Sequence, residues 1–142
     1  MPVNKDLIGK KLDFLNECIA KIDSMSFDEA VLEKNADIQD LLTFRLQQAV
    51  ETCIDIATHI IAGLNLPRKE SSKDAFLVLG KQGIIDEILA SRMGKAADFR
   101  NRVVHGYNNF DFSILFHDYK DDLNDLKNFG AQTVRFLEKQ IS

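Results

Sequence analysis

The chain has 142 residues, of which 45% are hydrophobic and 28% are charged. This composition excludes a mainly disordered protein, and the length predicts a single domain over residues 1–142. Its 18 basic and 22 acidic side chains give a net charge of −4, which excludes a protein that coats nucleic acid through bulk electrostatics. Two prolines and seven glycines are too few for the frequent turns of a small β-sandwich or barrel, so the sequence favours long helices.

The hydrophobic segments are too short for a membrane span. The longest, residues 53–66, is interrupted by Asp55 and His59 and falls below the ~20 apolar residues that a bilayer requires. The N-terminal segment MPVNKDLIGK lacks the apolar region of a signal peptide. Cys18 and Cys53 lack the spacing of metal ligands and lie on apolar stripes, which is typical of small core residues. We therefore expect a reduced, cytoplasmic protein with no membrane partner, no metal and no cofactor.

Apolar residues with helical spacing predict the first elements in the chain. A first helix is expected from residue 3 to about residue 22. Ser26 is the expected N-cap of a short helical piece that ends before Asn35. A long helix follows over residues 37–62, and Gly63 is expected to cap its C-terminus.

The second half of the chain continues the helical pattern. A short helix is expected over residues 73–79, closed by Gly80. Long helices are expected over residues 85–104 and 115–137, with a loop over residues 106–111 between them. Together these elements predict an all-α fold, an up-and-down four-helix bundle with an additional short helix.

Positive charge is concentrated near the end of the predicted helix over residues 85–104. Between residues 92 and 107 four basic side chains face a single acid, a net charge of +3, whereas the rest of the chain carries −7. The four are Arg92, Lys95, Arg100 and Arg102. We expect Arg92, Lys95 and Arg102 to be solvated charges that attract RNA.

Arg100 and His105 are the candidate catalytic residues. A guanidinium offers a planar fork of donors to phosphate oxygens, and an imidazole can accept and donate a proton near neutral pH. Cleaving RNA without a metal requires a base for the 2′-hydroxyl, an acid for the leaving oxygen and a cation for the charge on phosphorus. Five helical residues would turn the two side chains ~140° apart. They converge only if the helix ends near His105, which Gly106 favours as the residue after the cap.

The segment supplies one histidine, whereas the reaction needs two proton carriers. We therefore infer a symmetric homodimer in which two copies of the segment face each other. Such an interface would also account for Arg92 and Arg100 on or beside an otherwise apolar face. The alternative is a helix C-terminus that carries a favourable cation and a surface histidine.

The same residues resemble the HEPN superfamily of compact helical ribonucleases, which is defined by Arg, four to six residues and then His. They are most similar to the HepT toxins of the HepT/MNT toxin–antitoxin systems, whose Arg-x4-His-x-Tyr motif matches Arg100, His105 and Tyr107. The resemblance covers nearly the whole chain, and its segments follow the expected order. They are residues 37–39, 44–51, 59–61, 64–67, 75–79, 83–85 and 100–111.

This resemblance implies an RNA endonuclease toxin with Arg100 and His105 of both protomers at a homodimer interface, and with Asn101 as a supporting polar residue. It also implies a cognate MNT-type nucleotidyltransferase antitoxin that transfers AMP to Tyr107, where the added negative charge would repel RNA phosphate. We expect cleavage to leave 2′,3′-cyclic phosphate ends. Gly106 stands where the family most often has Asp, a change that removes no catalytic group.

Two other functions fit the sequence. A non-catalytic helical module would dock a nucleotidyltransferase partner without cleaving RNA, and a purely structural bundle would tolerate substitution throughout residues 100–107. Tyr107 also fits an amphipathic residue packed on the bundle with its hydroxyl at the surface. Arg45, Thr52 and His59 form a polar row that fits either the border of a cleft or a polar seam between helices.

Overall fold

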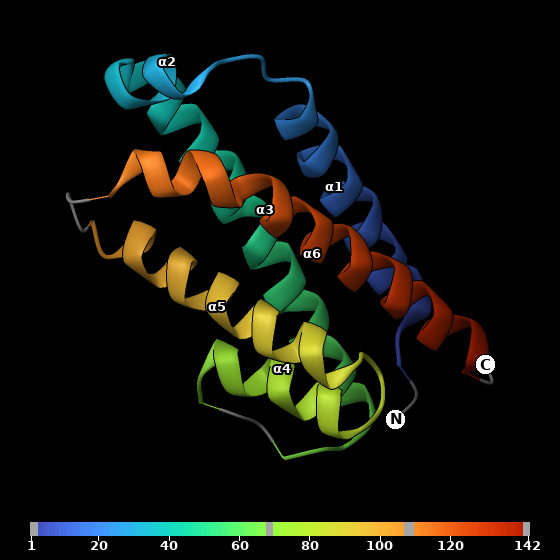
Figure 1. Ribbon diagram of the computed structural model, residues 1–142. Coiled ribbons are helices and arrows are strands. Elements are labelled where there is room, and N and C mark those ends of the chain that lie inside the picture. Colours follow the sequence, from blue (N-terminus) through green and yellow to red (C-terminus); the bar gives the residue numbers. More distant parts are fainter. Residues whose placement is uncertain (1–2, 68–69, 107–109, 141–142) are drawn as a thin grey trace.

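The computed structural model describes residues 3–67, 70–106 and 110–140, and these residues form six helices. Four long helices alternate in direction, and two short ones lie in the connections between them (Figure 1). The predicted all-α up-and-down bundle is therefore confirmed, and the short helical piece expected before Asn35 is a complete short helix. The helices are α1 (Lys5–Asp23), α2 (Glu29–Lys34), α3 (Ala36–Gly63), α4 (Ser72–Lys81), α5 (Glu87–Val104) and α6 (Phe112–Lys139).

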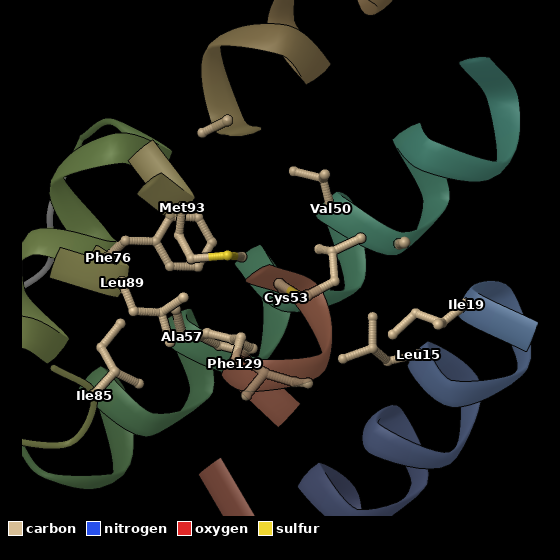
Figure 2. Close-up of a cluster of buried hydrophobic side chains, with 14 of the residues drawn as sticks. Leu15, Ile19, Val50, Cys53, Ala57, Phe76, Ile85, Leu89, Met93 and Phe129 are labelled. Atoms are coloured by element: carbon tan, nitrogen blue, oxygen red, sulfur yellow. The ribbon is translucent and has the colours of Figure 1, made fainter. Parts of the chain in front are cut away.

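The hydrophobic core lies along the middle of the bundle, where the apolar stripes of the helices meet. Phe76 of α4 and Phe129 of α6 are fully buried and pack edge to face, with ring centroids 5.6 Å apart. Cys18 and Cys53 are free and buried in this core, as the sequence predicted, and burial raises the pKa of the Cys53 thiol. Figure 2 shows residues from α1, α3, α4, α5 and α6 in one cluster, among them Leu15, Val50, Phe76, Met93 and Phe129.

Side-chain caps define where the helices begin. The prediction that Ser26 caps the short second helix is wrong, because Asp28 is the N-cap and its carboxylate accepts the Val31 N–H at 2.8 Å. A carboxylate at this position also interacts favourably with the helix dipole, which a serine hydroxyl does less strongly.

Two glycines that were expected to end helices lie inside them. A Cβ on Gly80 would come within 2.7 Å of a side chain of α5, and a Cβ on Gly63 would come within 2.9 Å of the Val3 backbone. Close packing therefore requires glycine at both positions. The left-handed backbone positions that follow these helices fall instead at Asn65 (φ 55°) and Gly83 (φ 72°).

The two ends of the bundle differ in character. The start of α1 and the end of α6 lie together at one end (Figure 1), where the Lys5 ammonium donates a hydrogen bond to the Gln140 carbonyl. At the opposite end lie α2, the starts of α3 and α6 and the C-terminus of α5 (Figure 1).

None of the helices in the described ranges is long and apolar enough to cross a bilayer.

Candidate active site at the end of helix α5

Helix α5 ends at the position that the sequence predicts. The helix ends at Val104, and His105 is the C-cap, whose N–H donates to the Asn101 carbonyl at 3.0 Å. Gly106 follows with φ 68°, a left-handed conformation that stops the helix. The predicted helix end is therefore confirmed, and His105 is an exposed residue five positions beyond Arg100.

Arg100 is half-buried and points toward α4. Its Nη2 donates a hydrogen bond to the Ser72 Oγ at 2.9 Å. Within the described ranges the Arg100 Nε is buried and has no hydrogen-bond acceptor. The structure thus brings Arg100 and His105 to the same end of α5, with the arginine fixed against the bundle and the histidine at the surface.

Phe110 contacts two residues near the end of α5. The ring of Phe110 lies 5.8 Å from the ring of Phe99, and the Arg102 guanidinium carbon lies 5.0 Å above the Phe110 ring. Arg102 is exposed, and the cation–π contact with Phe110 restrains its side chain. Asn101 is exposed at the same helix end. Tyr107, the expected AMP acceptor, lies outside the described residues.

The remaining basic residues of the segment differ in their surroundings. Lys95 is exposed, whereas the Arg92 Nε forms a salt bridge with the Asp125 carboxylate of α6 at 2.7 Å. This partner was not predicted from the sequence. The available signal was a row of acids with helical spacing on α6, namely Asp118, Asp121, Asp122 and Asp125.

The residues of the polar row on α3 differ in their surroundings. The Arg45 Nη1 donates to the Lys21 carbonyl at 3.0 Å, at the end of α1, and the Thr52 hydroxyl donates to the Gln48 carbonyl at 2.8 Å. Of the two interpretations of this row, the structure supports the seam for Arg45 alone, because the Thr52 hydroxyl bonds within its own helix and His59 is exposed.

The acidic row on α6 contains a carboxylate with an unusual pKa. Asp122 lies beside apolar residues of α3 and α5. Its pKa is raised to about 6, mainly because the carboxyl group is buried and secondly because the negative charge of Asp125 is close. Arg92 opposes this shift because its positive charge favours the ionised form. Ionised Asp122 therefore opposes folding at neutral pH.

Asp122→Asn should raise the free energy of unfolding by about 1 kcal/mol near pH 8. This is less than the full free-energy equivalent of the pKa difference, because solvent still screens the carboxylate. The pKa of Asp122 is about 6 in the folded chain against an ordinary 3.8, so the folded state binds the proton more tightly. Stability is then lost as the pH rises from about 4 to 6, and the benefit of Asn should vanish near pH 4. Urea unfolding at the two pH values measures this, with the exposed Asp121→Asn as control. An equal benefit at both would contradict the prediction.

A surface hollow of about 490 Å³ lies next to Ser72, the residue that accepts the hydrogen bond from Arg100. It lies between α3 and α4 and combines apolar walls with hydroxyl groups. Ser72 belongs to its lining, so a concave surface lies next to the hydrogen bond that fixes the guanidinium. The lining residues are Ile54, Thr58, Ile61, Ala62, Leu66, Glu70, Ser71, Ser72 and Ala75.

Known proteins are similar to this chain in sequence and in fold. The mRNA nuclease HepT of Shewanella oneidensis is 31% identical over 124 residues, which cover 87% of this chain and 93% of that protein. The tRNA nuclease HepT of Aphanizomenon flos-aquae is 33% identical over 112 residues, which cover 78% of this chain and 71% of that protein. A solved structure of the tri-AMPylated HEPN toxin of Shewanella oneidensis in complex with MNT antitoxin matches with a TM-score of 0.84 and 29% identity. That match covers 91% of this chain and 97% of the solved chain.

The family-level comparison extends across both halves of the bundle. The pattern of the family described as "Ribonuclease HepT-like" matches residues 15–132, a range that includes Arg100, His105 and Tyr107. With this match and the two relatives above 30% identity, the chain belongs to the HepT-like ribonuclease family.

Proposed function

We propose that this protein is an RNA endonuclease toxin that works as a homodimer and is neutralised by an MNT-type nucleotidyltransferase antitoxin. The observation that carries the proposal is the arrangement of Arg100 and His105 at the end of α5, in a chain of the HepT-like family. The relatives named as mRNA and tRNA nucleases support RNA as the substrate class.

The proposed reaction is a transesterification that needs no metal. One His105 imidazole removes the proton from the ribose 2′-hydroxyl, whose oxygen attacks phosphorus, and the bond to the 5′-oxygen breaks. The His105 of the second copy protonates that leaving oxygen. Arg100 offsets the negative charge that builds on the phosphoryl oxygens, and Asn101 supplies an additional polar contact. The products are a 2′,3′-cyclic phosphate and a free 5′-hydroxyl.

Exposed apolar side chains support a homodimer through this end of the bundle. Phe44 near the start of α3 is 53% exposed, Val104 at the end of α5 is 49% exposed and Ile114 at the start of α6 is 59% exposed. The starts of α3 and α6 and the end of α5 gather at the same end of the bundle (Figure 1), and Phe44 lies in the half of α3 nearer that end. Apolar surface of this kind is typical of protein interfaces. Sedimentation equilibrium should show a dimer, and a monomer that still cleaves RNA would refute this part of the proposal.

The other basic residues are proposed to draw RNA toward the site. Lys95 and Arg102 are exposed and contribute positive potential directly, whereas the charge of Arg92 is partly neutralised by Asp125. We therefore expect a smaller contribution to RNA affinity from Arg92 than from the other two.

Regulation is proposed to act on Tyr107, two residues beyond His105. AMP on this hydroxyl would add bulk and negative charge where the RNA phosphate must bind. The tri-AMPylated toxin complexed with MNT antitoxin, which has a similar fold, supports this assignment. After co-expression with the antitoxin, intact mass should rise by AMP-sized units that map to Tyr107. Tyr107→Phe should lose that added mass and remain toxic. A full mass gain in this variant would exclude Tyr107 as the acceptor.

The function is tested by incubating the purified protein with RNA in the presence of a chelator. Cleavage to fragments with 2′,3′-cyclic phosphate ends is the expected result. Formation of a complex with the nucleotidyltransferase but no RNA turnover would instead identify the chain as a non-catalytic binding module.

A further inference from the structure

Arg100 is fixed by a neutral partner. Its Nη2 donates to the hydroxyl of Ser72, 28 positions earlier in the chain, and the contact is partly buried. Within the described ranges Arg100 takes part in no salt bridge. Arg92 on the same helix shows the contrast, because its guanidinium pairs with the Asp125 carboxylate. A hydroxyl orients a guanidinium without neutralising its charge, which a carboxylate partner would do.

Ser72 lies on a helix that is held firmly against α5. Ser71 caps α4, since its Oγ accepts the Asp74 N–H at 3.1 Å. Lys73 forms a salt bridge with Asp98 of α5 at 3.6 Å. The two helices also approach closely at Gly80, where a Cβ would come within 2.7 Å of a side chain of α5. The salt bridge and the close approach at Gly80, and not the cap, hold Ser72 in place relative to α5.

We infer that Ser72 is a positioning residue, which aims the guanidinium of Arg100 at the phosphate that is cleaved. The inference rests on the proposed nuclease function, in which Arg100 carries the charge that stabilises the transition state. The other donors of Arg100 on its two Nη atoms remain for phosphate oxygens, while the hydrogen bond to Ser72 limits rotation of the side chain. Small displacements of such a group lower the rate of the chemical step strongly.

Adjacent serines provide a matched pair of variants. Ser72→Ala removes the hydrogen bond to Arg100 and should lower kcat about tenfold, with KM changed less than about twofold. Ser72→Thr restores a hydroxyl and should recover most of kcat. Ser71→Ala removes the cap of α4, so it should lower the thermal midpoint but leave kcat close to the unaltered value. An unchanged kcat in Ser72→Ala, or an equal fall in Ser71→Ala, would overturn the positioning role.

A second measurement does not depend on catalysis. In the NMR spectrum of the full-length protein, the Arg100 side-chain signals, assigned with Arg100→Lys, should show slow rotation about the Nε–Cζ bond. Ser72→Ala should accelerate this rotation several-fold, and Ser71→Ala should not. If the protein cleaves no RNA, the proposed function is refuted. The rotation rate of the Arg100 side chain would still test the hydrogen bond between Arg100 and Ser72. Equal rotation in Ser72→Ala and the unaltered protein would overturn the inference even if RNA is cleaved.

Discussion

Replacing His105 by alanine should lower the rate of RNA cleavage by about 10³-fold, because the variant loses the groups proposed to accept and donate protons. His105 is exposed at the end of α5, so the substitution should leave the fold intact. Cleavage rates under single-turnover conditions measure the effect, and circular dichroism checks the fold. His117→Ala is the control, since His117 lies on α6 with a side chain that is 66% exposed. A His105→Ala variant that cleaves RNA normally would exclude this catalytic site.

Arg100 can be tested in the same assay. Arg100→Ala should reduce cleavage by about 10²- to 10³-fold, the range found when a charge-stabilising donor is removed. Arg100→Lys keeps the positive charge but loses the planar fork of donors, so it should recover only a small part of the rate. Full activity in Arg100→Lys would show that a point charge suffices and that the planar fork of donors is not needed.

Mixed dimers distinguish a shared site from two independent ones. If both histidines are needed, mixing unaltered and His105→Ala protein in equal amounts should leave activity at about a quarter, because random pairing gives that share of unaltered dimers. Independent sites would leave about half. The subunits must exchange fully before the assay, which differently tagged copies can verify. A fall to only about half would contradict the composite site.

Phe129→Ala should lower the free energy of unfolding by about 3–5 kcal/mol, a large fraction of the stability of a typical domain. Phe129 has no exposed surface, and its ring packs edge to face on Phe76 at 5.6 Å (Figure 2). The smaller side chain would leave a cavity where α6 meets α4. The shift of the urea midpoint measures the loss.

Two further variants define the origin of this loss. Phe129→Leu keeps most of the volume and should lower stability by about 1.5 kcal/mol or less. Phe14→Ala removes a ring that is 42% exposed on α1 and should have a much smaller effect than Phe129→Ala. Equal losses at positions 14 and 129 would contradict the central place of Phe129 in the core.

Much of the fold followed from periodicity alone. Apolar residues repeat every three or four positions, and this spacing located the long helices to within a few residues of their observed bounds. Glycine predicted the ends of helices less reliably than periodicity predicted their positions. Gly106 does end α5, with φ 68°, but Gly80 lies inside α4. The local preference of glycine for helix ends was outweighed at Gly80 by the need for close contact with α5.

In the candidate site, too, some features could be predicted from the sequence and others could not. The order of residues in α5 identified Arg100 and His105, and the chain itself signalled the helix end that separates them. The partners of the arginines could not be predicted. Ser72 is 28 positions from Arg100 and Asp125 is 33 positions from Arg92, so these contacts form only when α4 and α6 pack against α5.

The amino-acid sequence by itself therefore determined the all-α bundle, the Arg-x4-His-x-Tyr motif and membership of the HepT-like family, because these depend on spacing along the chain. Only the tertiary structure decided that one arginine keeps its charge beside a neutral hydroxyl while the other is paired with a carboxylate. The physical reason is that helix packing, and not sequence spacing, selects which side chain lies opposite each guanidinium.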